Sequence, residues 1–390
     1  MHYDFDKIIE RQGTNSVKYD LRKQLFGSEE VLPMWVADMD FETPDFIRKS
    51  VVERANHLIY GYTFRSNAYY KSIVDWQKRH HNWKITKDWI LFSPGIVAAL
   101  NMIVLALTNP NDEIIVQPPV YFPFFTAVKN HKRCLVYNNL ILPEQGYRMD
   151  FDLLEKQAKT AKMIILCNPH NPVGRSWKTD ELQRLSEICI KNDLLIISDE
   201  IHCDLVLPPN KHTVFASLNT EIAARTITLH AASKTFNLAG LSTSSIIISD
   251  EKLRETVKTY IENLHVDMGN LFGIVATQTA FEKGDEWLRQ LLVYVNRNVD
   301  EVCDFLSKHL PKIKVFRPEA TYMVWLDFNA YGLTDNDIRS MLIEKAKLGF
   351  NSGIEFGSNG SGFYRMNLGC PLQTVKQALL QLKQTFESYE

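Results

Sequence analysis

The sequence predicts an α/β protein whose sheet is mostly parallel, and three observations lead to this fold class. From about residue 89, β-branched apolar runs alternate with helical patterns, as in parallel sheets that helices cover on both faces. Polar residues suited to ligand binding follow several of these runs directly, and parallel sheets bind ligands at the carboxyl ends of their strands. The length of 390 residues and the hydrophobic content of 45% allow two or three domains with substantial cores.

The first 44 residues are irregular and aromatic. Pro33 and Pro44 bracket an apolar segment, which predicts an extended N-terminal arm, residues 1–44, that packs with a small domain. Helices are predicted at Asp45–Leu58 and Tyr69–His81. The second helix ends in two histidines, but no carboxylate or cysteine stands at ligand spacing from them, so we expect a solvated helix end and no metal site.

A large domain is predicted for residues 45–284, and it contains the sheet. Helical patterns at Ile96–Leu107 and Lys178–Lys191 separate some of its strands. The buried runs that we expect to form the strands are Trp89–Phe92, Glu113–Gln117, Arg133–Tyr137, Lys162–Cys167, Leu194–Ser198, Thr226–Leu229 and Ser245–Ile248.

The alternation ends near residue 285, which predicts a smaller α+β domain over residues 285–390. A long helix is expected at Asp285–Leu310, because Pro311 stops it. The remaining elements expected here are strands within Lys314–Phe328, a helix at Asp335–Lys347, a strand at Phe363–Asn367 and a terminal helix.

The charge and cysteine content narrow the class of protein. A formal net charge of −2 argues against a nucleic-acid or membrane-surface partner. The 6 cysteines are scattered without a CxxC pair, which indicates reduced, buried thiols instead of a disulfide framework or a zinc site. The N-terminus lacks the apolar core of a signal peptide, and no run of about 18 apolar residues exists. We therefore expect a cytoplasmic protein.

The segment Thr226–Leu241 places a lysine, Lys234, after a predicted buried strand and among small residues. A lysine that loses part of its hydration can form a Schiff base, because burial disfavours the ammonium and leaves a nucleophilic amine. Taken alone, the pattern also fits an ordinary solvated loop lysine. The neighbouring motifs decide between the two interpretations.

Three other segments add complementary groups at strand ends. The turn at Ser93–Gly95 leads into a helix whose free N–H groups and dipole suit a phosphate, although any strand–helix junction can carry glycine. The segment Cys167–Gly174 holds two Asn-Pro pairs that fix side-chain amides in place. Asp199 ends another strand, three residues before His202. Its carboxylate suits a metal, a base to be activated or a cationic ring nitrogen, and it also suits a helix cap.

A phosphate cradle, an amide, a carboxylate and a Schiff-base lysine occur here in an order that resembles the fold type I pyridoxal-phosphate enzymes of the aminotransferase class I/II superfamily. The similarity is greatest to the branch of cystathionine β-lyases called MalY/PatB, and it extends from about residue 35 to residue 371. It implies a large domain with a mostly parallel seven-stranded sheet and a smaller α+β C-terminal domain. The stretches that carry the resemblance are WVADMDF, YGYT, FSPGIVAALN, QPPVYFPF, CNPHNPVG, SDEIHCDL, SKTFNLAGL, PEATYMVWLDF and FYRMNLGCP.

The resemblance implies a site for pyridoxal 5'-phosphate and a small amino-acid substrate. Lys234 would hold the cofactor and exchange the proton at the substrate Cα, while Asp199 would keep the ring nitrogen protonated. Tyr121 would stack on the ring. The other implied contacts are Gly95, Ile96, Val97 and Ser233 at the phosphate, Asn171 and His202 near the phenolic oxygen, and Arg365, Asn171 and Ala37 at the substrate, with Arg365 clamping its carboxylate.

The resemblance also implies a homodimer whose active sites share residues. Tyr62 would reach the phosphate across the dimer interface, with Tyr60 as the competing candidate. Two positions depart from the aminotransferase pattern: Ser242 stands where those enzymes usually carry a phosphate-binding arginine, and Ala231 stands where serine is frequent. An aminotransferase must retain its cofactor without a covalent link to lysine, so a weaker grip on the phosphate favours a lyase.

Three functions are therefore compared. The leading one is a carbon–sulfur β-lyase that cleaves L-cystathionine or a related cysteine conjugate to a thiol, pyruvate and ammonia. The second is an aminotransferase, which would need a 2-oxoacid acceptor and against which Ser242 argues. The third is a non-catalytic pyridoxal-phosphate-binding protein that acts through interactions, and the intact Lys234, Asp199 and Arg365 argue against it.

Overall fold

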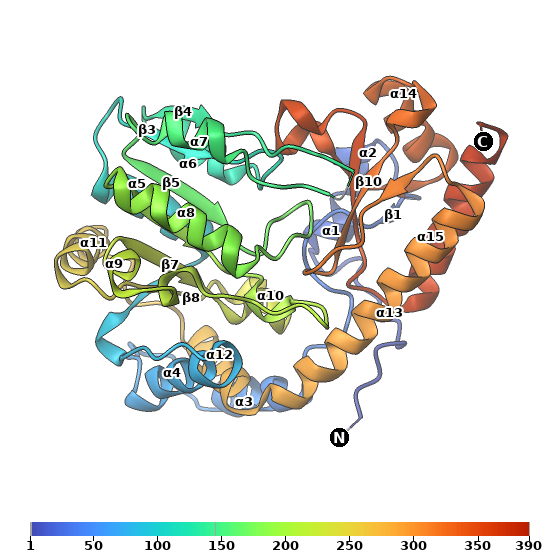
Figure 1. Ribbon diagram of the computed structural model, residues 1–390. Helices are drawn as coiled ribbons and strands as arrows, with labels where there is room; N and C mark the ends of the chain where they lie inside the picture. Colours follow the sequence, from blue (N-terminus) through green and yellow to red (C-terminus); the bar gives the residue numbers. More distant parts are fainter. Residues whose placement is uncertain (1, 145, 390) are drawn as a thin grey trace.

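The computed structural model describes residues 2–144 and 146–389, and a seven-stranded sheet lies at its centre (Figure 1). The strand order is β2-β8-β7-β6-β5-β3-β4. Strand β8 is antiparallel to both its neighbours, and the other pairs run parallel, so the predicted mostly parallel α/β sheet is confirmed. The strands are β2 (Ile90–Ser93), β3 (Glu113–Val116), β4 (Cys134–Tyr137), β5 (Met163–Cys167), β6 (Leu195–Asp199), β7 (Thr226–His230) and β8 (Ser244–Ile247), each within about one residue of its predicted range.

Helices cover both faces of this sheet, which explains why its central strands are apolar throughout. Alternate residues of a strand point to opposite faces: Ile165 packs into one core cluster and Ile164 into the other. The first face is covered by α5 (Ile96–Leu107), α6 (Pro123–Lys129) and α11 (Glu251–Asn263), and the second by α7 (Phe151–Gln157), α8 (Thr179–Lys191) and α9 (Thr220–Ala223).

Three helices pack together beside the β2–β8 end of the sheet, at the lower left of Figure 1. They are α3 (Asp45–Ala55), α4 (Asn67–His81) and α12 (Leu271–Lys283). Helix α4 begins two residues before its predicted start, because the hydroxyl of Ser66 accepts the Tyr69 N–H and caps the first turn. Helix α3 ends three residues before the predicted Leu58, and a turn and an irregular segment follow it.

The C-terminal part is built on the long helix α13 (Asp285–His309), which in Figure 1 runs from near α3 to the C-terminal helix. A second sheet has the order β12-β13-β10-β9. The predicted helix from Asp335 is divided, since α14 (Asp335–Ser340) continues as a π-helical turn, Met341–Lys345. The remaining elements are β9 (Lys314–Val315), β10 (Met323–Asp327), β11 (Leu348–Gly349), β12 (Asn351–Ser352), β13 (Phe363–Asn367), α10 (Ala232–Thr235) and α15 (Leu372–Phe386).

The N-terminal segment is more regular than predicted. It contains α1 (Val17–Asp20) and α2 (Arg22–Phe26), and β1 (Leu32–Pro33) pairs with β11. Buried ion pairs hold this segment in place, because Lys18 Nζ lies 2.7 Å from Asp40 Oδ2 with its side chain 1% exposed. Helices this short have little stability alone and depend on tertiary contacts. The local sequence pattern does not show such contacts, so these helices were not predicted.

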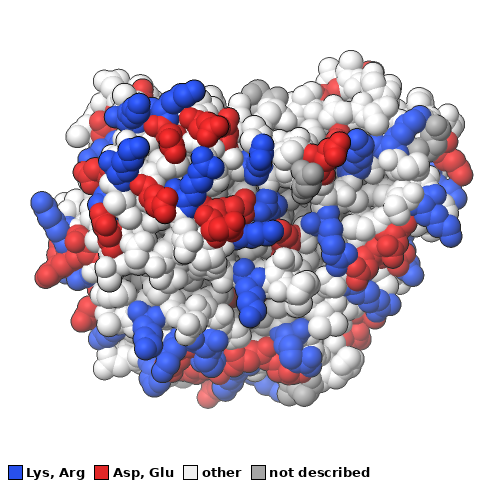
Figure 2. Space-filling model, viewed as in Figure 1, with Lys and Arg blue, Asp and Glu red and all other residues white. Residues whose placement is uncertain are grey.

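The surface and the thiols complete the description. On the face shown in Figure 2, acidic and basic side chains are interspersed. Among the described residues, no helix combines the length and the apolar character needed to cross a bilayer. All 6 cysteines are free, but the prediction of buried thiols is wrong for Cys134, which is exposed where the edge strand β4 begins, and Cys303 is only partly buried.

Candidate active site

A cavity of about 270 Å³ lies at the carboxyl ends of β5, β6 and β7. The carboxyl ends of parallel strands meet at one edge of the sheet, and ligands of such sheets bind at this edge. Ten of the predicted site residues line the cavity together: Ala37, Gly95, Ile96, Val97, Tyr121, Asn171, Asp199, His202, Ser233 and Lys234.

Lys234 lies in the short helix α10, directly after β7. Its Nζ donates a hydrogen bond of 2.6 Å to the carbonyl oxygen of Ala37. Burial, together with the nearby positive charge of Arg365, lowers the pKa of Lys234 to about 8. An amine with this pKa is partly neutral near pH 7 and is therefore a usable nucleophile and base, unlike a solvated loop lysine.

Asp199 is the last residue of β6 and is 3% exposed. The backbone N–H of Ile201 donates to its Oδ1 at 3.2 Å, so the turn-capping interpretation has some basis. Burial nevertheless raises the pKa of Asp199 to about 7. Within the described part of the chain it forms no ion pair, and a buried carboxylate at a cavity wall without a cation is suited to a cationic group of a ligand.

The N-terminus of α5 forms another wall of the cavity. Gly95 precedes the helix with φ +144°, and a Cβ built there meets nothing within 4 Å. No side chain caps this helix, so the backbone N–H groups of Ile96 and Val97 at its first turn are available to an anion. Ser233 lines the same cavity.

Neutral polar groups and an aromatic ring form the remaining wall. His202 is 3% exposed and its Nδ1 has no hydrogen-bond partner. Burial, with the positive charge of Lys234, holds the pKa of His202 well below its usual value, so the ring is uncharged. Burial raises the pKa of Tyr121, so its phenol also remains neutral.

Arg365 lies behind Asn171 and is absent from the cavity lining itself. Its Nη1 donates to Asn171 Oδ1 at 2.9 Å, and its Nη2 donates to Asn351 Oδ1 at 2.7 Å. The side chain is in β13 and is 4% exposed, yet no described carboxylate forms an ion pair with it, and its Nε has no partner. Burial lowers the pKa of Arg365 to about 10, so it is still charged at neutral pH.

Tyr62 does not join the cavity within one chain. Its side chain is 99% exposed, whereas the hydroxyl of Tyr60 donates to the backbone oxygen of Ala55 at 2.5 Å. Tyr62 was predicted to contact the phosphate bound by a second copy of the chain. The structure of a single chain does not test this contact, so it stays a prediction.

Two supporting residues were missed by the analysis of the sequence. Asn351 holds Arg365, and the hydroxyl of Tyr322 donates to the oxygen of Ala37 at 2.9 Å, the same oxygen that Lys234 contacts. Asn351 stands directly opposite Arg365 in the β12–β13 pair. Its position could only be recognised once that strand pairing was known, because nothing in its own segment marks it.

His81 contradicts the expected solvated helix end. Its side chain is only 3% exposed, and its Nε2 lies 2.7 Å from Asp204 Oδ1. The prediction failed because the carboxylate is 123 residues away in the sequence, far outside any local ligand spacing.

The arrangement can bind an anion at α5, a cationic nitrogen at Asp199 and a carbonyl carbon at Lys234, and comparison with known proteins agrees with this set. Residues 29–382 match the protein family described as aminotransferase class I and II. The chain is 42% identical to cystathionine beta-lyase PatB of Bacillus subtilis (strain 168) over 382 residues, which is 97% of this chain and 99% of the relative.

Two solved structures are also similar. Cystalysin from Treponema denticola, which contains a pyridoxal 5'-phosphate cofactor, has a TM-score of 0.97 and 36% identity and covers 100% of both chains. The PLP-bound C-S lyase from Staphylococcus hominis has a TM-score of 0.93 and 35% identity and covers 99% of this chain and 98% of its own.

Proposed function

The chain belongs to the aminotransferase class I and II family, and from this premise we propose that it is a pyridoxal-phosphate-dependent carbon–sulfur β-lyase. L-cystathionine, or a related cysteine conjugate, and water give homocysteine or another thiol, pyruvate and ammonia. One observation carries the proposal: a lysine whose pKa is lowered to about 8 shares a cavity with a buried carboxylate that forms no ion pair in the described part of the chain. The activities named for PatB and for the Staphylococcus hominis lyase support the choice of reaction.

The residues of the cavity fit pyridoxal phosphate. Its phosphate suits the uncapped N-terminus of α5, and its ring nitrogen suits the carboxylate of Asp199, whose pKa is raised by burial. Tyr121 offers an aromatic face, while Asn171 and His202 offer neutral polar atoms toward the ring. When bound, the cofactor supplies an electron-accepting ring that stabilises negative charge at the substrate Cα.

Lys234 performs the proton transfers. The neutral amine takes the Cα proton at Nζ, and its lowered pKa increases the share of neutral amine near pH 7. The bond between Cβ and sulfur then breaks, and the proton held at Nζ is available to the departing thiolate. The contact from Nζ to the Ala37 oxygen orients the amine before the reaction.

Arg365 binds the substrate carboxylate in this proposal. A buried guanidinium without a counter-ion destabilises the folded protein, and an anionic ligand group would supply the missing negative charge. Asn171 and Asn351 hold the guanidinium plane through its Nη1 and Nη2 atoms. The fixed plane favours two parallel hydrogen bonds to a carboxylate over contact with a single point charge.

Ser242 supports a lyase over an aminotransferase. It lines the cavity near the N-terminus of α5, where an arginine would add a second positive group for the phosphate. A cofactor held by fewer phosphate contacts depends more on its covalent link to Lys234, which a lyase restores in every turnover.

The proposal is tested by incubating the purified, cofactor-loaded protein with L-cystathionine and no 2-oxoacid. Sustained release of pyruvate and homocysteine in equal amounts is expected. A parallel reaction contains a 2-oxoacid, and amino-group transfer that occurs only there would assign the chain to the aminotransferases instead. Cysteine conjugates of different size then define the leaving group.

A homodimer completes the proposed site. The segment 58–64 exposes large apolar side chains, with Leu58 at 97% and Phe64 at 81%, more than a monomer surface usually leaves uncovered. A second copy that covers this segment would bring Tyr62 toward the neighbouring cavity, whereas Tyr60 is already bonded within its own chain. Light scattering on the loaded protein measures the mass, and a monomer would refute the shared site. The cytoplasmic location remains a prediction.

A further inference from the structure

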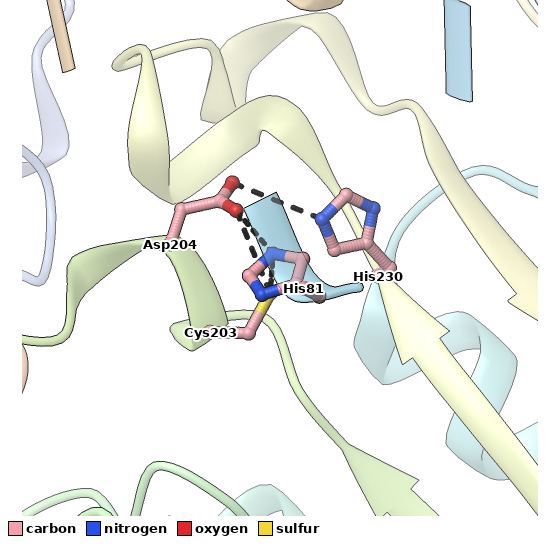
Figure 3. Close-up of side chains that lie close together, drawn as sticks. All are labelled: His81, Cys203, Asp204 and His230. Atoms are coloured by element: carbon pink, nitrogen blue, oxygen red, sulfur yellow. Dashed lines mark hydrogen bonds and ion pairs between the residues drawn. The ribbon is translucent and has the colours of Figure 1, made fainter. Parts of the chain in front are cut away.

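A second buried polar cluster adjoins the active site, since Cys203 follows the cavity residue His202 in the chain. It consists of His81, Cys203, Asp204 and His230, and Figure 3 shows the four side chains converging on one point. They come from the end of α4, the turn after His202 and the end of β7. One potential ligand atom of each residue lies within 4.8 Å of all the others.

The separations within this cluster are close to those between ligands of one metal ion. Cys203 Sγ lies 3.5 Å from His81 Nε2 and 3.8 Å from Asp204 Oδ1, and His230 Nε2 lies 3.8 Å from Asp204 Oδ2. Tetrahedral zinc with bonds of about 2.0 Å to nitrogen or oxygen and about 2.3 Å to sulfur separates its ligands by roughly 3.3 to 3.6 Å. The one shorter contact is the 2.7 Å hydrogen bond between His81 Nε2 and Asp204 Oδ1.

His230 is the residue that a plain hydrogen-bond network leaves unexplained. It is 1% exposed, and neither of its ring nitrogens has a hydrogen-bond partner among the residues that the structure describes. Its Nε2 faces the Asp204 carboxylate across a gap too long for a hydrogen bond. An imidazole in this position is unsatisfied unless something occupies the gap, and imidazole nitrogen is a common zinc ligand.

The surroundings of Asp204 also resemble those of a metal-bound carboxylate. Trp76 Nε1 donates to its Oδ1 at 2.9 Å, and Thr235 Oγ1 donates to its Oδ2 at 2.8 Å. Carboxylates that bind metals are usually oriented by such outer hydrogen bonds. The nearby His212 is already paired with Glu200 at 2.7 Å and is therefore not a ligand.

We propose that His81, Cys203, Asp204 and His230 form a divalent transition-metal site that takes zinc. Two imidazoles, one thiolate and one carboxylate make a closed four-coordinate set of borderline donors, which suits zinc better than magnesium or calcium. On binding, Cys203 releases its thiol proton to solvent and binds as the thiolate. Nε2 of His81 gives up the proton that it shares with Asp204, so that short contact widens. His81 is followed by the exposed Asn82, so the path for the ion from solvent is short.

The site is structural, because no ligand position is left open for a substrate. It ties together two segments that carry active-site residues: Cys203 follows His202, and the Asp204 partner Thr235 follows Lys234. The proposal is independent of the lyase activity, since a chain without zinc still has the cavity described above.

Metal analysis of the cofactor-loaded protein tests the proposal. The protein is produced in zinc-supplemented medium, desalted against a weak chelator and measured by inductively coupled plasma mass spectrometry. About one zinc ion per chain is expected for the unmodified protein and less than about a tenth of that for His230→Gln. Cys189→Ser, which removes a buried thiol of α8 that is not part of the cluster, is the matched control and retains the zinc.

X-ray absorption on the unmodified zinc-loaded protein decides the case even if a variant does not fold. One sulfur neighbour at about 2.3 Å and nitrogen or oxygen neighbours at about 2.0–2.1 Å are expected. Absence of retained zinc, a spectrum without sulfur, or full zinc retention by folded His230→Gln would each overturn the site. Pyruvate release from L-cystathionine is measured on the same samples, so the zinc site and the proposed activity are tested independently.

Discussion

The active-site cavity and the cluster at Asp204 are two buried polar regions built from neighbouring residues, yet their charges are balanced in opposite ways. In the cavity, burial raises the pKa of Asp199 to about 7, and no described cation pairs with it. Behind it, burial alone would raise the pKa of Asp204, but contacts with His230 and His81 hold it well below its usual value. Asp199 accepts a backbone hydrogen bond but forms no ion pair among the described residues, whereas Asp204 accepts hydrogen bonds from several side chains.

This difference indicates that Asp199 is suited to binding a ligand and Asp204 to holding the fold together. A buried charge without a partner is destabilising in the free protein, and a ligand that supplies the partner regains that free energy on binding. A buried charge with several fixed donors holds the segments that carry those donors. The two carboxylates are five residues apart in the chain, so the contrast arises from what the fold brings to each of them.

The largest expected effect comes from removing the catalytic lysine of the active-site cavity. Lys234→Ala removes the base at the substrate Cα, and turnover of L-cystathionine should fall by about 10³-fold or more. Pyruvate release measures the loss, and Lys191→Ala, at an exposed position ending α8, should leave it unchanged. A Lys234→Ala protein with full activity would refute the assignment.

Asp204→Ala tests the scaffold side. It leaves the donors of Trp76, Thr235 and His81 without their acceptor in a buried region, so the free energy of unfolding should fall by about 3 to 5 kcal/mol. Urea unfolding of the cofactor-loaded protein measures the change. Asp152→Ala, at a side chain 90% exposed, should shift it by less than about 1 kcal/mol. Equal effects of the two substitutions would remove the contrast.

The pH dependence of stability sharpens the comparison at Asp199. Its folded-state pKa of about 7 lies above the ordinary 3.8, so the folded protein binds the extra proton between these values and loses stability as pH rises. In the cofactor-free protein, Asp199→Asn should remove a decline of about 2 kcal/mol between pH 5 and pH 7. Urea unfolding at both pH values measures it. Bound cofactor should flatten the decline, and a wild-type slope unchanged by either treatment contradicts the unpaired carboxylate.

The smallest expected effect concerns the guanidinium plane. Arg365→Lys keeps a positive charge but loses the fork of donors, so the KM for L-cystathionine should rise by about 10- to 100-fold with a smaller change in kcat. Steady-state kinetics with varied substrate measure both constants. Asn351→Asp should also raise the KM, because the new carboxylate would form an ion pair with Arg365 and compete with the substrate carboxylate. An unchanged KM for both variants would exclude Arg365 from carboxylate binding.

Local pattern was sufficient for the sheet and for most of the cavity. The strands are short β-branched runs with buried residues on both faces, so their positions follow from the chain itself. Asp199 and Lys234 stand at or just beyond strand ends, and parallel strands bring those ends to one edge. The family resemblance then supplied the roles that position alone leaves open.

Contacts across the chain were needed for the rest. Asn351 supports Arg365 only through the pairing of β12 with β13, and the short helices of residues 17–26 depend on ion pairs such as Lys18 with Asp40. Neither residue type nor spacing marks such positions. A buried polar group is recognised by its surroundings, and those come from distant segments.

The sequence by itself determined the order of strands and helices, the residues at the strand ends and the family, because periodicity and motifs are local properties of the chain. The tertiary structure alone decided which carboxylate is balanced. It brought His81 and His230 to Asp204 and left Asp199 without an ion pair among the described residues, since burial and long-range contact set the energy of a charge.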